Sequence, residues 1–102
     1  MLLHTVLFWL KPDVSPSDRA LFERGLRSLT TISTVTFASI GTPAATRRPI
    51  IDSSYSYKLV VGFADLAGHA VYQDADIHEA FRQQCGSWWS TVTIYDSTEL
   101  AP

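Results

Sequence analysis

The sequence predicts a single small α+β domain. Short apolar segments with strand character alternate with amphipathic segments, in the order strand, helix, strand, strand, helix, strand. The 102 residues are enough for one domain, spanning residues 1–102. Only 18% of the residues are charged, whereas globular domains average about 25%. This composition predicts more apolar surface than one small core can hide, and hence a partner, a pocket, or both.

The segment 2–10, which reads LLHTVLFWL, is predicted to be the first strand because it is short, apolar and rich in β-branched and aromatic residues. Successive side chains of a strand point to opposite faces. One face would carry His4 and Phe8, and the other Leu7 and Trp9, so both faces are largely apolar. One helix layer can cover only one of them. We therefore expect a second layer against the other face.

A helix is predicted over 16–29. Ser15, followed by a proline, is a typical helix start, because its side chain can cap the first turn. Phe22, Leu26 and Leu29 then recur at helical spacing and form one apolar stripe.

The rest of the chain alternates in the same way. Asp65 is predicted to cap the second helical region, which should break near 74–76. The predicted elements after the first helix are a strand over 35–40, a loop over 44–54, a strand over 55–64, a helical region over 66–85 and a strand over 88–96.

This β-α-β-β-α-β order is the split β-α-β pattern of ferredoxin-like folds. It predicts a four-stranded antiparallel sheet with the helices on one face. Because several strands are apolar on both faces, the bare face should meet a second copy of the chain. Such a two-fold homodimer would be a dimeric α+β barrel.

Charge and hydropathy argue against several other partners. The net charge is −2 and the only basic pair is Arg47-Arg48, so we expect no nucleic-acid binding. The longest apolar stretches are much shorter than the roughly 20 residues of a membrane-spanning helix. The N-terminus has no signal-peptide pattern, and the single cysteine, Cys85, cannot form an internal disulfide. These features predict a cytoplasmic protein without a membrane partner.

Three segments along the chain are informative when they are taken together. They read HTVLFWLK, YSYKLVVGFADLAGHAVYQDADIHEAF and WWSTVTIYD. In this order the chain resembles, over nearly its whole length, the stress-responsive A/B-barrel (Dabb) family. The resemblance implies homodimerisation and a pocket between the sheet and the helices, in a family most of whose members have no assigned reaction.

The resemblance also implies candidate site residues. A plant polyketide cyclase related to this family uses a Tyr and a His in the second helical region, and Tyr72 and His78 stand at the matching places. His4 matches a pocket His on the first strand, and Tyr57 replaces a further His on the third. Many members read Y-x-x-H-P-x-H here, whereas this chain has Ala-Asp in place of the His-Pro pair.

These side chains allow two interpretations. His78 could act as a general base with Tyr72 and His4 assisting, in a reaction that needs no cofactor. Alternatively, His78 caps a helical turn and Tyr72 fills the core. For Asp96, near the end of the last strand, a structural role is favoured.

We predict no metal site. The nine-residue spacing from His69 to His78 is looser than the usual pairs of zinc ligands. His69 is expected to face solvent from the second helix.

Three functions remain open from the sequence. The first is a homodimer that binds a small, mostly apolar molecule at His4, Tyr57, Tyr72 and His78. The second is a cofactor-free enzyme of the cyclase or monooxygenase type that uses His78 and Tyr72. The third is a structural, stress-protective assembly module. The feature that separates them is whether Tyr72 and His78 face a common cavity.

Overall fold

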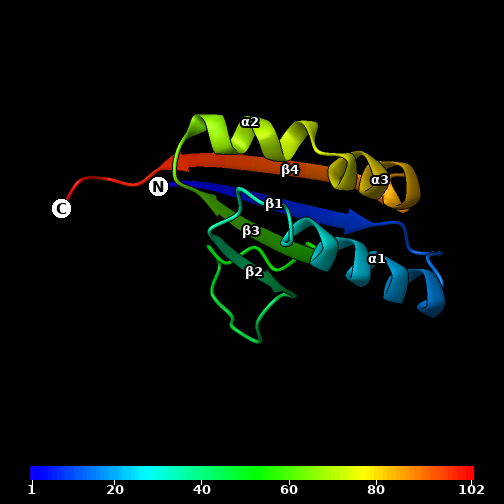
Figure 1. Cartoon of the computed structure of the whole chain (residues 1–102). Helices are drawn as coiled ribbons and strands as arrows, with labels where there is room; N and C mark the ends of the chain where they lie inside the picture. Colours follow the sequence, from blue (N-terminus) through cyan, green and yellow to red (C-terminus); the bar gives the residue numbers. More distant parts are fainter.

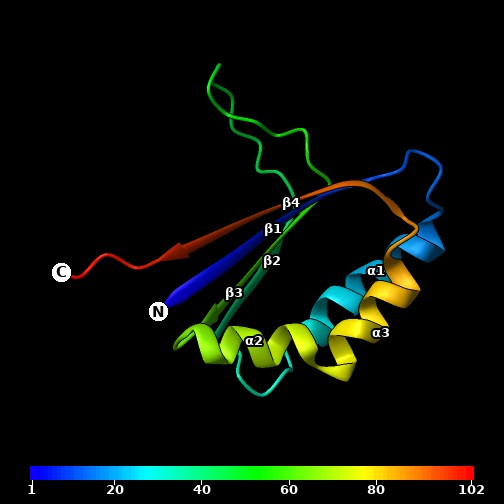
Figure 2. The same cartoon turned by 90° about the horizontal axis from the view of Figure 1, so that it is seen from above.

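Four strands form one antiparallel sheet, and three helices cover one of its faces (Figures 1 and 2). The structure is a computed structural model that describes residues 1–102. No helix in it combines the length and apolar character that a membrane crossing requires. Its elements are β1 (Leu2–Leu10), α1 (Pro16–Leu29), β2 (Phe37–Gly41), β3 (Tyr57–Phe63), α2 (Leu66–Asp74), α3 (Asp76–Cys85) and β4 (Trp89–Thr98).

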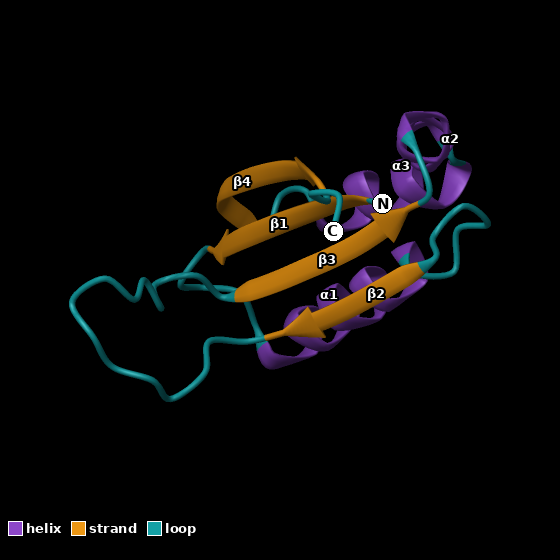
Figure 3. Ribbon diagram, turned by 90° about the vertical axis from the view of Figure 1, so that its left-hand side faces the viewer, coloured by secondary structure: helices purple, strands orange, loops and turns teal.

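The strand order β2-β3-β1-β4 is visible in Figure 3. It confirms the predicted ferredoxin-like arrangement, in which the two strands joined by each helical crossover are not neighbours. The second helical region consists of two helices, α2 and α3, in agreement with the predicted break near 74–76.

The predicted helix starts are confirmed. The Ser15 hydroxyl accepts a hydrogen bond from the Asp18 amide at 3.1 Å and caps α1. The Asp65 carboxylate accepts one from the Gly68 amide at 2.9 Å and caps α2. Each cap satisfies an amide that would otherwise lack a partner in the first turn.

The predicted break in the second helical region lies at Ala75. Its backbone is extended, with ψ of 144°, so it ends α2 and precedes α3. Its amide still donates to the Tyr72 carbonyl at 3.3 Å. The two helices consequently run in different directions over the sheet, as Figure 2 shows.

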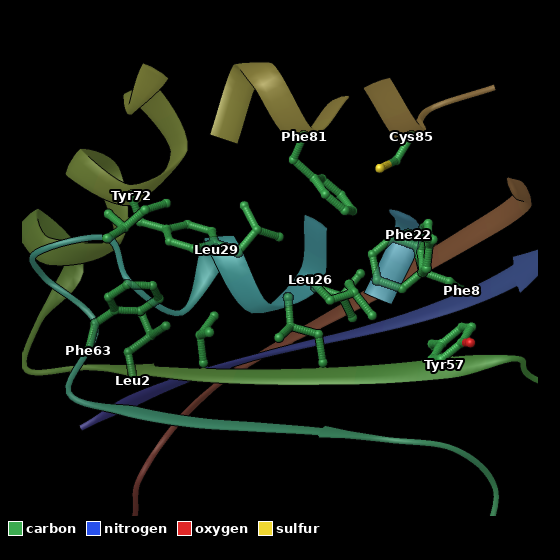
Figure 4. Close-up of a cluster of buried hydrophobic side chains, with 14 residues drawn as sticks. Leu2, Phe8, Phe22, Leu26, Leu29, Tyr57, Phe63, Tyr72, Phe81 and Cys85 are labelled. Atoms are coloured by element: carbon green, nitrogen blue, oxygen red, sulfur yellow. The ribbon is translucent and has the colours of Figure 1, made fainter. Parts of the chain in front are cut away.

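The helix-facing side of the sheet holds the core (Figure 4). Leu2, Val6 and Phe8 alternate along β1 and point to this side with His4 between them. They meet α1 and α3, which approach so closely at Gly25 that a Cβ there would lie 2.8 Å from the Phe81 ring. The core residues of the other elements are Phe22, Leu26, Leu29, Ile32, Tyr57, Leu59, Val61, Phe63, Tyr72, Phe81 and Cys85.

The opposite face of the sheet carries no helix and mixes apolar with polar side chains, among them Thr5, Lys58 and Thr93, so it is less apolar than predicted. The strand register places Leu3 and Leu7 of β1 on it, together with Val60 of β3. Tyr95 of β4 lies beside Thr5 on the same face and is 63% exposed. We refer to this surface as the open face.

The loop between β2 and β3, predicted over 44–54, has no regular structure and projects on the side of the sheet away from the helices (Figure 2). The Trp9 indole donates to the Ser54 hydroxyl at 3.0 Å, and this bond ties the end of the loop to the open face.

Candidate functional site

A cavity of about 440 Å³ lies between the sheet and the α2–α3 pair. The inward faces of β1 and β4 form its floor, and the two helices form its roof. A larger but shallower hollow of about 690 Å³ lies on the surface beside the α2–α3 junction and contains none of the predicted site residues. The apolar lining of the 440 Å³ cavity includes Val6, Phe8, Phe81, Trp89, Val92 and Ile94.

Three of the four predicted site residues line this cavity: His4, Tyr72 and His78. The extended backbone of Ala75 lets Tyr72, near the end of α2, meet His78, in the first turn of α3. The Tyr72 and His78 rings meet edge to face with centroids 5.1 Å apart. The Tyr72 and His4 rings are 5.7 Å apart, also edge to face. Residues from three elements therefore converge on one space.

His78 carries an unsatisfied polar atom. Its Nδ1 is buried and has no hydrogen-bond partner in the chain. Buried polar atoms without a partner are rare in folded proteins, and each calls for a specific explanation. Burial lowers the pKa of His78, and Arg82 and His4 lower it further. The neutral imidazole is therefore favoured at neutral pH, with one nitrogen able to accept a proton.

Burial also changes the acidity of the Tyr72 hydroxyl. Its side chain is almost wholly enclosed, and burial raises the pKa of its hydroxyl above the ordinary value of 10.0. The hydroxyl consequently stays protonated at neutral pH and can donate a hydrogen bond to a group in the cavity.

His4 connects the cavity to a second polar group. Its Nδ1 lies 2.5 Å from Asp96 Oδ1 and 3.2 Å from His69 Nε2. Burial lowers the pKa of His4, while Asp96 opposes this effect. His69 is half-buried against His4 and Phe63, so the expectation that it faces solvent was wrong. Packing of α2 on the end of β3 turns this side of the helix inward.

Tyr57 lies apart from the other predicted site residues, at the far end of the core from Tyr72 (Figure 4). Its hydroxyl donates to Glu23 Oε2 at 2.5 Å and accepts from Arg19 at 3.4 Å. Tyr57 pairs with Phe8 in the sheet, whereas His4 pairs with Val61. Tyr57 is not among the residues that line the cavity. It lies on β3 and packs against Phe22 of α1, whereas the strands that line the cavity are β1 and β4.

The sequence reasoning missed two polar residues of the cavity, Gln73 and Arg82. Arg82 could have been found, because it follows His78 by four residues and so shares its face of α3. Gln73 is next to Tyr72 in sequence, but no helical spacing relates it to another predicted site residue.

The antiparallel sheet, the helices on one face and the cavity between them define a ferredoxin-like α+β protein. The model of the stress-responsive A/B barrel domain (Dabb) matches residues 2–99, and the chain belongs to this family. The resemblance seen in the sequence is thereby confirmed.

Solved structures of similar proteins share this fold. A Dabb family protein with a ferredoxin-like fold from Mesorhizobium loti is 25% identical, with a TM-score of 0.78 and coverage of 98% of this chain and 97% of that one. A dimeric ferredoxin-like protein of unknown function from Thermobifida fusca is 17% identical, with a TM-score of 0.78 and coverage of 96% and 90%. The hydroxynitrile lyase of Passiflora edulis is 15% identical, with a TM-score of 0.78 and coverage of 99% and 96%. No curated protein sequence matches the chain significantly.

Proposed function

We propose that this protein is a homodimer that binds a small, mostly apolar molecule in the cavity between its sheet and its helices. The observation that carries the proposal is that His78, whose buried Nδ1 has no hydrogen-bond partner, lines a largely apolar cavity. A ligand with an apolar body and one polar group would satisfy this nitrogen and fill the space around it.

The dimensions and lining of the cavity support this function. Its volume of about 440 Å³ lies within the range of small-molecule sites, about 300–1,000 Å³. Seven of its eleven lining residues are hydrophobic. The lining also contains a few polar side chains, including Gln73 and Arg82, which could orient a ligand. This cavity favours ligand binding over a purely structural role.

The open face supports the homodimer. It presents Leu3, Leu7 and Val60 without any covering layer in one copy of the chain. Apolar side chains that share one uncovered face favour an interaction site in a soluble protein. The Thermobifida relative of the same fold is described as dimeric. We propose that two open faces pack together around a two-fold axis.

Filling the cavity is expected to block ligand binding. Ile94 lines the cavity and is 49% exposed, so Ile94→Trp can add bulk there without disturbing the core. The probe is 1-anilinonaphthalene-8-sulfonate, whose fluorescence rises in apolar surroundings and whose sulfonate suits Arg82. We expect its affinity to fall more than about tenfold, which corresponds to about 1.4 kcal/mol.

The matched control is Ile50→Trp, because Ile50 is 92% exposed in the loop between β2 and β3. This variant should bind the probe like the unchanged protein. Equal binding by Ile94→Trp and the unchanged protein would place the probe elsewhere and contradict the cavity as a ligand site.

A second candidate function is cofactor-free proton transfer of the cyclase or monooxygenase type, in which His78 is the base. It is favoured by the edge-to-face contact of Tyr72 with His78 at 5.1 Å in a largely apolar space. The neutral His78 imidazole could remove a proton from a bound molecule, and the protonated Tyr72 hydroxyl could stabilise the negative charge that develops. The Passiflora lyase demonstrates only that the same fold can hold an enzyme site.

His78→Ala is expected to remove this activity. A suitable probe is 5-nitrobenzisoxazole: a base removes its ring proton, the N–O bond breaks, and a coloured cyanophenolate forms. We expect a rate loss of about 10²–10⁴-fold, the usual contribution of a general base. His69→Ala, outside the cavity lining, should keep the rate.

The pH profile gives an independent check. Because the pKa of His78 lies below 6.5, the rate should rise as pH increases through that lowered pKa and be level at neutral pH. An unchanged rate in His78→Ala, or a profile that keeps rising above pH 7, would exclude His78 as the base.

A further inference from the structure

Three groups with metal-binding chemistry meet where the first part of β1 pairs with the end of β4. His4 and Asp96 are direct partners in the β1–β4 register. His69 reaches them from α2. One donor atom from each of the three residues lies within 4.8 Å of the other two. We refer to these residues as the His-His-Asp cluster.

The nitrogen His4 Nδ1 cannot form good hydrogen bonds with both of its neighbours in the cluster at the same time. His4 Nδ1 lies at hydrogen-bond distance from both Asp96 Oδ1, at 2.5 Å, and His69 Nε2, at 3.2 Å. If this nitrogen donates to an ionised Asp96, it has no lone pair left for His69. If it accepts from His69, its lone pair faces the carboxylate. A bound cation would accept a lone pair from each of the three atoms and remove this conflict.

The dimensions suit a small divalent metal ion. Zinc bonds to imidazole nitrogen and carboxylate oxygen are about 2.0–2.2 Å long, so tetrahedral ligand atoms are about 3.3 Å apart. The nitrogens of His4 and His69 are already 3.2 Å apart. Asp96 would need to withdraw by somewhat less than 1 Å. Its side chain is 44% exposed at the edge of the sheet, so it is free to do so.

The surroundings hold the two rings in place. The Tyr72 ring packs edge to face on His4, and the Phe63 ring packs edge to face on His69. Exposed Asp96 gives the ion a path from solvent, while buried His4 closes the opposite side. Three protein ligands with one open side are the arrangement of catalytic zinc sites.

We propose that His4, His69 and Asp96 bind a divalent transition-metal ion of the zinc class. Imidazole and carboxylate ligands suit Zn²⁺ and Co²⁺ in preference to Ca²⁺ or Mg²⁺. The sequence predicted no metal site because the three residues are far apart along the chain and only the β1–β4 register brings them together. The metal site shares His4 with the cavity lining, whereas His69 and Asp96 lie outside that lining, so substitutions at His69 and Asp96 test the metal site separately from the ligand proposed for the cavity.

The test adds Co²⁺ alone to the whole, tag-free chain, followed by Zn²⁺. We expect one Co²⁺ per chain, with the visible absorption bands of a four-coordinate site, and displacement of Co²⁺ by Zn²⁺. Calorimetry then gives the Zn²⁺ affinity of each variant. His69→Ala and Asp96→Asn should each weaken binding by more than about tenfold, since even outer-shell substitutions cost about 10–100-fold.

His78→Ala is the matched control, because it removes a histidine of the cavity that is not in the cluster, and Zn²⁺ affinity should be unchanged. His4→Ala is not used because His4 is part of the buried layer. Absence of stoichiometric Co²⁺ binding, or unchanged affinity in both His69→Ala and Asp96→Asn, would overturn the proposal. Neither result would affect the binding of the naphthalene probe in the cavity, so the two proposals can fail separately.

Discussion

Leu7→Glu is expected to convert the proposed homodimer to monomers. Leu7 lies on the open face of β1, opposite Lys58 of β3 and Thr93 of β4, and is only half-buried in a single copy of the chain. Burying a leucine contributes about 1.5–3 kcal/mol. In a two-fold interface each substitution counts twice, which gives about 3–6 kcal/mol. The dissociation constant should therefore rise by about 10²–10⁴-fold, measured by light scattering over a dilution series.

The matched control for this experiment is Leu66→Glu. Leu66 is 73% exposed at the start of α2, on the helix side of the molecule, and a glutamate there also suits the positive end of the helix. This variant should stay dimeric at the concentrations where Leu7→Glu is monomeric. A dimer that tolerates Leu7→Glu would show that the open face is not the interface.

Phe22→Ala is expected to lower the free energy of unfolding by about 3–5 kcal/mol. Phe22 on α1 is 0% exposed, and its ring lies 5.2 Å from Phe8 and 5.8 Å from Phe81 between centroids. It thus joins α1 to both β1 and α3. Domains of this kind are stable by only about 5–15 kcal/mol, so the loss is a large share of the total.

Urea unfolding measures this loss, at one fixed protein concentration because the proposed dimerisation would add to the apparent stability. Phe22→Leu keeps most of the apolar volume and should cost about 1.5 kcal/mol or less. If Phe22→Ala were as mild as Phe22→Leu, the packing of α1 against α3 would not depend on this ring.

The site was only partly predictable. Tyr72 and His78 were singled out through a family resemblance, and the helical break that brings their rings together was expected near Ala75. Tyr57 was included through the same resemblance, as the residue that replaces a histidine on the third strand. It lies on β3 against α1, whereas β1 and β4 line the cavity. Which strands and helices enclose a cavity depends on long-range pairing, which local sequence does not reveal.

The ends of the strands were also only partly predictable from the sequence. The strand predicted over 88–96 extends to Thr98, because it pairs with β1 as far as Leu2. The strand predicted from residue 35 begins at Phe37, because the Val35 amide donates to the Ile32 carbonyl in a turn instead. Strand ends are set by the partner strand, which local sequence does not reveal.

By itself, the sequence determined the order of the elements, the two helix caps and the break between α2 and α3. These properties depend on residues within about one turn or one strand of each other. The tertiary structure decided which polar residues meet. His4 and Asp96 are 92 residues apart in sequence, and His4 and His69 are 65 apart. Their contacts exist only because β1 pairs with β4 in one register while α2 packs over the same end of the sheet, and this long-range pairing is specified by the whole core.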